Sequence, residues 1–169
     1  MIIYLIGFMG SGKTTIGEKL QEQLQMEYTD TDEYIEKMTG RTIPDIFALE
    51  GEKAFRTYET NALKEITSGV VSTGGGIVET AENISFMKDN GVVVYLPTSL
   101  NVIENRLHDD QSRPLWKQPA AARAALFARR SLLYESTADI TVETDHKTVE
   151  EISAEVVSLL GNRPVQDCQ

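Results

Sequence analysis

The sequence predicts an α/β domain in which a parallel sheet is covered by helices on both faces. Short apolar runs rich in β-branched residues alternate with segments whose apolar residues recur at helical spacing. The first apolar run, 2–6, leads directly into a glycine-rich loop and then into a helical pattern. A length of 169 residues is enough for one domain with a sizeable core.

The composition excludes several classes of protein. At 41% hydrophobic and 25% charged residues it is that of an ordinary globular chain. A formal net charge of −10 argues against nucleic acid or an anionic membrane as the main partner, and it means that an anionic substrate needs a local basic pocket. No apolar run reaches the length of a membrane span, and the chain starts with a strand-like run rather than a signal peptide. A single cysteine, Cys168, cannot form an internal disulfide, so we expect a cytoplasmic protein.

The elements follow from apolar periodicity and from glycine and proline signals. The predicted strands are 2–6, 26–30, 70–73, 92–96 and 140–142, which gives a central parallel sheet of five strands. The predicted helices run from the glycine loop to about 25, then over 30–40, 44–51, 52–66, 80–89, 99–107, 119–134 and 148–160. Gly40 and Gly91 are stop signals, Pro97 closes a strand, and Pro119 suits the first turn of a helix.

Two segments interrupt this alternation. Residues 31–66 place several helical pieces between two strands, and residues 108–118 are polar and unpatterned. Because ligands of α/β folds bind at the carboxyl ends of the strands, we predict that the first is a helical substrate-binding insertion and the second a lid loop. The alternative for each is a decoration without a role. Residues 1–160 are expected to form a single domain, and 161–169 a disordered tail.

The stretch 7–14 fits the pattern G-x-x-x-x-G-K-[ST] of a phosphate-binding P-loop. Glycines let backbone N–H groups approach a phosphate closely, and the helix that starts there adds the positive end of its dipole. Lys13 can reach the terminal phosphates, and the Thr14 hydroxyl can ligate Mg²⁺. The sequence therefore predicts nucleotide binding.

A second Mg²⁺ group is expected from an acid at the end of a strand. Strands 70–73 and 92–96 end in Gly and Pro, whereas 26–30 ends in Asp30, with Asp32 two residues later. One carboxylate could hold the metal through water while the other orients or deprotonates a hydroxyl. The alternative is helix capping, because Asp30 and Glu33 have a capping-box-like spacing. The P-loop favours the site.

Other charged residues allow two interpretations each. Arg56 and Glu59 are three apart on a helix, and this spacing alone favours a surface ion pair over an oriented guanidinium for a substrate carboxylate. Arg113, followed by proline in the predicted lid, can swing over phosphates. Arg129 and Arg130 are adjacent on a helix, and periodicity does not say which one faces a site.

Three glycines, Gly74, Gly75 and Gly76, follow the strand at 70–73. They could form a slack turn. At the active edge of a sheet they would also let backbone N–H groups approach a ligand.

The ordered motifs of this chain resemble those of the shikimate kinase family over about residues 1–160. They are G-F-M-G-S-G-K-T-T at 7–15, D-T-D at 30–32, F-R-x-x-E at 55–59, T-G-G-G at 73–76, R-P-L at 113–115, and Arg130 four residues before Tyr134. The resemblance implies a three-layer α/β/α P-loop fold like that of nucleoside monophosphate kinases, with ATP and Mg²⁺ as cofactors. It also implies transfer of a phosphoryl group to the 3-hydroxyl of shikimate, and a monomeric enzyme.

The resemblance further implies roles for individual residues. Lys13, Asp32 and Arg113 would be catalytic, and Thr14 and Asp30 would hold the metal. The nucleotide would contact Gly10, Ser11, Gly12, Lys13, Thr14, Thr15, Arg106, Arg113 and Lys147. The substrate would contact Asp32, Arg56, Gly74, Gly75, Gly76 and Arg130.

Two departures from the family pattern bear on lid packing and on the aim of Arg130. Trp116 stands where the family usually has a smaller apolar residue, and Ser131 and Leu132 replace a turn-like stretch that often contains proline. A gluconate kinase of similar fold is the alternative enzyme, against which the D-T-D and R-P-L motifs speak. A nucleotide-dependent switch is the alternative of another class, but the N-K-x-D signature of a GTPase is absent.

Overall fold

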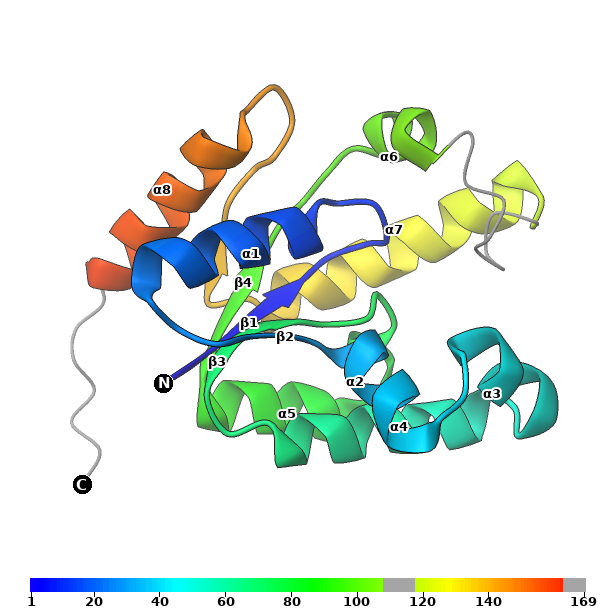
Figure 1. Ribbon diagram of the computed structural model, residues 1–169. Helices are drawn as coiled ribbons and strands as arrows, with labels where there is room; N and C mark the ends of the chain where they lie inside the picture. Colours follow the sequence, from blue (N-terminus) through cyan, green and yellow to red (C-terminus); the bar gives the residue numbers. More distant parts are fainter. Residues whose placement is uncertain (108–117, 163–169) are drawn as a thin grey trace.

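The computed structural model describes residues 1–107 and 118–162 of the chain. Within these residues, one parallel sheet has five strands in the order β2-β3-β1-β4-β5 (Figure 1). The strands are β1 (Ile2–Ile6), β2 (Tyr28–Asp30), β3 (Gly69–Ser72), β4 (Val92–Tyr95) and β5 (Ile140–Thr141). The predicted strands are all present, and their ends differ from the prediction by no more than two residues.

The helices also follow the prediction closely. They are α1 (Lys13–Leu24), α2 (Thr31–Thr39), α3 (Ile43–Leu49), α4 (Glu52–Glu65), α5 (Ala81–Asn90), α6 (Leu100–Leu107), α7 (Ala120–Thr137) and α8 (Val149–Gly161). Gly40 ends α2 in the left-handed conformation, with φ 66°. Pro119 is the N-cap of α7 rather than part of its first turn, and this helix continues past Tyr134. A short 3₁₀ turn, η1 (Ile77–Glu79), was not predicted.

The sheet is the middle of three layers. Along β1, the side chains of Ile3 and Leu5 pack with α1 and α8, whereas those of Tyr4 and Ile6 pack with α5 and α7. Figure 1 shows these helices on the two faces of the sheet. Because β1 is buried on both faces, it appears in the sequence as a continuous apolar run. The three-layer α/β/α prediction is therefore confirmed.

Helices α2, α3 and α4 have a small core of their own. Ile35, Ile46, Phe55 and Ala62 form this cluster, and the ring of Phe47 lies 4.7 Å from that of Phe55. The cluster holds together the residues between β2 and β3, the segment expected to insert at the substrate side (Figure 1). It packs α2, α3 and α4 against one another. The division into a main domain and an insertion stays a prediction.

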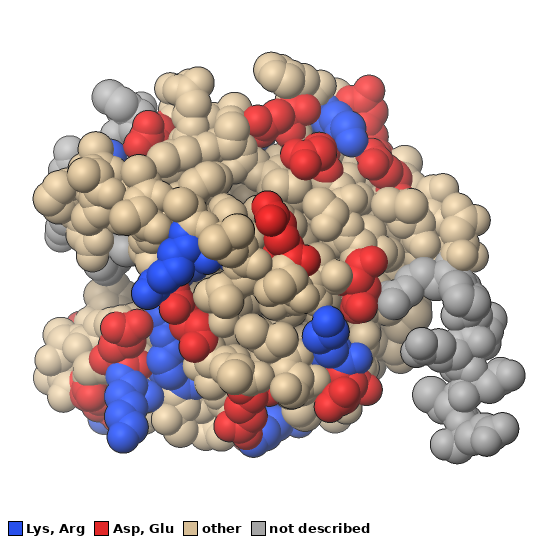
Figure 2. Space-filling model, turned by 180° about the vertical axis from the view of Figure 1, so that it is seen from behind, with Lys and Arg blue, Asp and Glu red and all other residues tan. Residues whose placement is uncertain are grey.

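The surface carries both signs of charge. Figure 2 shows acidic and basic side chains interspersed on the rear face, without a continuous basic area there.

None of the helices in residues 1–107 and 118–162 combines the length and the apolar character that a membrane span requires.

Candidate active site

The glycine-rich loop between β1 and α1 has the geometry of a phosphate cradle. Gly10 and Gly12 have φ angles of 76° and 94°, in the region that side chains other than glycine rarely adopt. The Lys13 ammonium donates hydrogen bonds to the carbonyl oxygens of Gly7 at 2.7 Å and Phe8 at 3.0 Å. The loop therefore folds around its own lysine, which lies at the position expected for a phosphate ligand.

A crevice of about 540 Å³ opens beside this loop. Its lining includes most of the predicted nucleotide and metal residues, namely Gly10, Ser11, Gly12, Lys13, Thr14, Thr15, Asp30, Arg106 and Lys147. Asp32, Gly74 and Gly75, which were predicted to contact the substrate, line the same crevice. The structure thus brings residues from five separate parts of the sequence to one opening.

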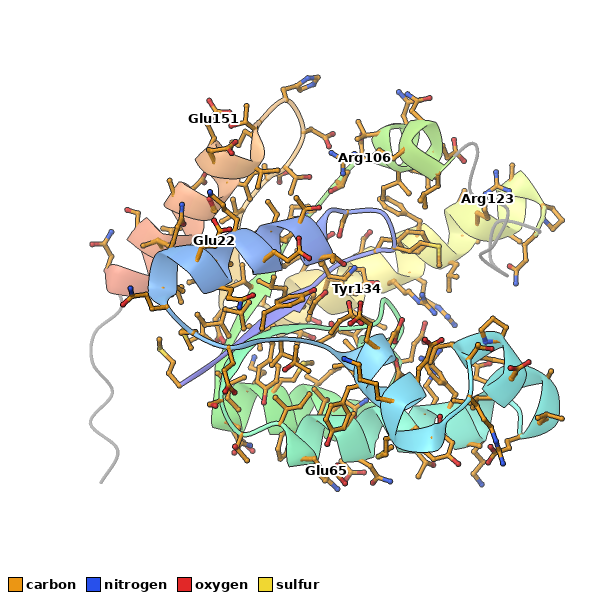
Figure 3. All side chains as sticks on the ribbon, viewed as in Figure 1. Glu22, Glu65, Arg106, Arg123, Tyr134 and Glu151 are labelled. Carbon is orange, nitrogen blue, oxygen red and sulfur yellow. The ribbon has the colours of Figure 1, made fainter. Side chains whose placement is uncertain are left out.

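Arg106 and Lys147 reach this crevice from different elements. Arg106, on α6, donates to the carbonyl oxygen of Gly10 at 3.0 Å, and Figure 3 shows its side chain extending toward the loop before α1. Lys147, just before α8, donates to Glu155 at 2.6 Å. Both basic groups therefore lie at the crevice while held by partners of the protein itself.

Asp30 caps a helix and also lines the crevice. It is the N-cap of α2, and its Oδ1 accepts hydrogen bonds from the backbone N–H groups of Asp32 at 2.9 Å and Glu33 at 3.3 Å. Asp30 and Asp32 also line the crevice. A carboxylate has about four acceptor positions, so capping at one oxygen leaves capacity for a ligand.

The oxygen groups at this place fit Mg²⁺. Thr14 and Asp30 line the same crevice, and both offer the oxygen donors that Mg²⁺ prefers. No group of three or more His, Cys, Asp or Glu side chains suited to a metal occurs in the described residues. Mg²⁺ at phosphates usually keeps several waters and takes one or two protein ligands.

Charged side chains pack closely against two glycines of the Gly74–Gly76 segment, Gly74 and Gly76. None of the three glycines has a positive φ, so their backbone conformation does not require glycine. A Cβ at Gly76 would lie 2.3 Å from Nη1 of Arg56, and one at Gly74 would lie 3.0 Å from both Asp32 Oδ1 and Glu59 Oε1. Close packing at Gly74 and Gly76 speaks against a slack turn at these two positions.

This segment is held in place from both sides. The N–H of Gly74 donates to the Thr31 hydroxyl at 3.1 Å, and the Tyr134 hydroxyl donates to the carbonyl oxygen of Gly75 at 2.5 Å. A Cβ at Gly75 would lie 3.5 Å from the backbone nitrogen of Met9 in the P-loop. The segment is thus the point where the phosphate loop meets the remaining charged residues. The labelled Tyr134 in Figure 3 lies centrally, on α7.

Arg56 and Glu59 form a buried pair rather than a surface pair. Nη1 of Arg56 donates to Glu59 at 2.6 Å and Nη2 donates to Glu52 at 3.0 Å, while the Glu59 side chain is only 1% exposed. Burial raises the pKa of Glu59 to about 7, and the negative charge of Asp32 also raises it. The charge and hydrogen bond of Arg56 act in the opposite direction and lower the pKa. The surface-pair interpretation was wrong because helical spacing contains no information on burial.

The structure separates the two adjacent arginines. The side chain of Arg130 is 8% exposed and that of Arg129 is 62% exposed. Arg130 lies against the glycine segment, with Nη1 3.5 Å from where a Cβ of Gly75 would be. Arg56, Gly76 and Arg130 are therefore not part of the crevice lining. Arg56 instead contacts Gly76, and Arg130 contacts Gly75, which does line the crevice. Ser131 and Leu132 simply continue α7.

Two residues at the site were not predicted. Glu79 accepts hydrogen bonds from both Arg129 and Arg130, and Tyr134 binds the carbonyl oxygen of Gly75. Both are long-range contacts, for which the sequence carries no local signal. Arg113, Trp116 and most of the predicted lid lie outside the described residues.

Together, a parallel sheet between two layers of helices, a P-loop after β1 and an adjoining charged crevice define the class of P-loop kinases for small molecules. The family model described as shikimate kinase matches residues 9–161. A shikimate kinase of Bacillus cytotoxicus is 46% identical over 163 residues, which cover 95% of this chain and 98% of the relative. The chain belongs to the shikimate kinase family.

Solved structures agree with this assignment. A shikimate kinase from Acinetobacter baumannii in complex with shikimate superposes with a TM-score of 0.91 at 39% identity, covering 98% of this chain and 95% of that one. Shikimate kinase from Aquifex aeolicus gives a TM-score of 0.83 at 42% identity, covering 96% and 98%.

Proposed function

We propose that this protein transfers the γ-phosphoryl group of ATP to the 3-hydroxyl of shikimate, giving shikimate 3-phosphate and ADP. The observation that carries the proposal is the gathering of Asp32, Arg56 and Arg130 around a glycine segment that touches the P-loop. This combination suits an acceptor with a reactive hydroxyl and a carboxylate. Membership of the shikimate kinase family supports the same substrate.

On the nucleotide side, the backbone N–H groups of the P-loop would receive the phosphates of ATP. Lys13 would exchange its bonds to the carbonyl oxygens of Gly7 and Phe8 for phosphate oxygens, a charged and therefore stronger partner. Thr14 and water-linked Asp30 would hold Mg²⁺, which neutralises charge on the phosphates when bound. Arg106 and Lys147 would lie near the adenine end, and Arg113 would reach the phosphates.

On the acceptor side, Asp32 would accept a hydrogen bond from the 3-hydroxyl and then its proton. The hydroxyl oxygen forms a bond to the γ-phosphorus as the bond between that phosphorus and the bridging oxygen of ADP breaks. Asp32 lies at the N-terminus of α2, whose first turn is fixed by the Asp30 cap. The base is therefore attached to a rigid element, as positioned proton transfer requires.

Specificity for the acceptor would come from its carboxylate. Arg56 and Arg130 lie against Gly76 and Gly75 respectively, so a substrate resting on the glycine backbone would meet a guanidinium on either side. The planar fork of arginine can make two parallel charged hydrogen bonds to one carboxylate. In a chain of net charge −10, such a local pair is what an anionic substrate needs.

An ADP-release assay with purified protein tests the proposal. Release should depend on Mg²⁺ and on shikimate, and should be far slower with gluconate or quinate at the same concentration. Equal release with gluconate would favour the other kinase, and release that no acceptor stimulates would leave only a nucleotide-binding module. The cytoplasmic location, the monomeric state and the domain boundaries stay predictions.

A further inference from the structure

We propose that Glu79 is a positioning residue for the acceptor site, which holds the Arg130 guanidinium by its inner edge so that the outer edge faces the substrate carboxylate. The inference rests on the proposed function. It assigns a role to an acidic residue that no sequence motif of this chain includes.

Glu79 connects the glycine segment to α7. It is the last residue of η1, three positions after Gly76, and its own N–H donates to the carbonyl oxygen of Gly76 at 3.0 Å. Its Oε1 accepts from Nε of Arg130 at 2.8 Å and from Nη2 of Arg129 at 2.8 Å. The turn that contributes the glycine backbone to the site therefore also holds the arginine beside it.

Glu79 binds one edge of the Arg130 guanidinium, and this leaves the other edge for a ligand. A guanidinium is planar, with the Nε–H on its inner edge and the terminal N–H groups on its outer edge. With Nε bound to Glu79, Nη1 points toward Gly75, 3.5 Å from where a Cβ would be. The Phe8 ring, 6.0 Å from Cζ, limits the guanidinium on a further side.

The charge of Glu79 suits this role. Burial by itself would raise the pKa of this carboxyl group, but the hydrogen bond and charge of Arg130, followed by the charges of Arg129 and Arg56, bring the pKa below its usual value. Glu79 is therefore an anion at neutral pH, and its bond to Arg130 is charge-assisted. A neutral amide at this position would keep the shape and lose most of the attraction.

A second interpretation is that Glu79 imitates the substrate carboxylate and competes with it for Arg130. The two interpretations predict opposite changes in shikimate affinity when Glu79 is removed. If Glu79 positions Arg130, its removal weakens shikimate binding; if it competes, its removal strengthens binding. Occupation of Nε rather than of the outer edge favours positioning.

The test compares Glu79→Gln with Glu82→Gln. Glu82 is a matched control, because it is a nearby glutamate that pairs with Lys64 on the exposed surface. For Glu79→Gln we expect KM for shikimate to rise by about tenfold, the size of one lost hydrogen bond to a charged group. The kcat at saturating shikimate and KM for ATP should change less than about twofold, and Glu82→Gln should match the wild type.

Additional variants separate positioning from general structural damage. Glu79→Asp keeps the charge with a shorter reach, so its KM should lie between those of wild type and Glu79→Gln. Arg129→Ala leaves the bond between Glu79 and Arg130 intact and should change KM less than about threefold, in the range of an exposed ion pair. In an Arg130→Ala background, Glu79→Gln should have no further effect on KM. Melting temperatures report whether each variant is folded.

The outcomes distinguish this inference from the proposed function. If the wild type shows no shikimate-dependent ADP release, the proposed function fails and the inference fails with it. If the wild type is active but Glu79→Gln keeps its KM, or shifts it as Glu82→Gln does, only the role of Glu79 is overturned. A lower KM in Glu79→Gln also overturns it, in favour of competition. Should Glu79→Gln not fold, an unchanged KM in Glu79→Asp would contradict the inference.

Discussion

The phosphate half and the acceptor half of the crevice are built in different ways. The phosphate loop of the phosphate half is one continuous stretch, residues 7–15, which offers backbone N–H groups and the ammonium of Lys13, while Asp30, Arg106 and Lys147 reach the same crevice from other elements. On the acceptor side, Asp32 of α2 lines the crevice, whereas the side chains from α4, η1 and α7 lie against the glycine segment at its edge, most of them in charged pairs. The first depends on local backbone conformation, and the second depends on how distant elements pack.

This difference has a consequence for substitution. In the phosphate loop, Lys13 donates to backbone carbonyl oxygens rather than to a charged side chain. In the acceptor half a change at one residue releases its charged partner, because Glu59 is paired with Arg56 and Glu79 with Arg130. We therefore expect changes in the two halves to alter different kinetic constants, as follows.

The largest effect is expected for Asp32→Asn, which is nearly isosteric. Because the amide cannot accept the proton of the hydroxyl, turnover should fall by about 10²–10⁴-fold, the usual contribution of a positioned general base. ATP should still bind with nearly unchanged affinity, which equilibrium titration with a fluorescent analogue can measure. Near-normal turnover at saturating shikimate would show that Asp32 serves only the start of α2.

Lys13→Ala should damage the nucleotide side in a different manner. Loss of this ammonium removes charge stabilisation from both bound ATP and the transition state, so KM for ATP should rise while kcat falls by about 10²-fold. KM for shikimate should remain close to that of the wild type. A variant in which KM for shikimate rises as much as KM for ATP would contradict the separation of the two halves.

Arg56→Lys keeps the charge but loses the planar fork that meets Glu59, Glu52 and a carboxylate. We expect kcat/KM for shikimate to fall by about 30-fold or more, the lower end of the cost of breaking a buried charge pair. For an analogue of shikimate with an alcohol in place of the carboxylate, kcat/KM should be nearly the same in Arg56→Lys as in the wild type. Arg41→Lys, which alters an exposed pair with Glu50, is the control and should be nearly neutral. Equal losses for both acceptors would make Arg56 structural.

Gly76→Ala tests whether close packing explains the glycine segment. The new Cβ would overlap the end of the Arg56 side chain, at 2.3 Å from Nη1, and a flexible side chain can move away. Activity with shikimate should therefore fall by about tenfold or more, while the melting temperature changes little. Gly161→Ala is the control, since nothing lies within 4 Å of its Cβ position. A large loss of stability with intact kinetics in the folded fraction would argue against the prediction.

The smallest expected effect is that of Glu59 on how the stability of the protein depends on pH. The pKa of Glu59 is about 7, above its ordinary value of 4.5, because the buried carboxyl group favours the neutral form. A carboxyl group with a raised folded-state pKa binds its proton more tightly in the folded protein, so its contribution to stability is present at low pH and is lost as pH rises through about 7. Wild type should therefore lose stability relative to Glu59→Gln between about pH 4.5 and 7. Urea unfolding of both proteins across this interval measures the difference, and a flat difference contradicts it.

The predicted helices and strands match the structure because their sequence signals are local. The alternation of apolar runs with helical periodicity predicted the strands and helices, and Gly40 was recognised as a stop signal. The misses lie where local propensity is not decisive. The turn at Ile77–Glu79 packs against α7 and is joined to it through Arg129 and Arg130, which no short window of sequence contains.

The sequence alone therefore determined the fold class and the phosphate loop, because the backbone conformation of that loop is set by adjacent glycines and the neighbouring helix. It also identified the acidic and glycine-rich segments beside it. Only the tertiary structure decided that Arg130 rather than Arg129 is buried, that Glu59 is inaccessible to water, and that Glu79 joins η1 to α7. The physical reason is that spacing along a helix specifies a face, whereas burial and charge pairing depend on which distant element packs against that face.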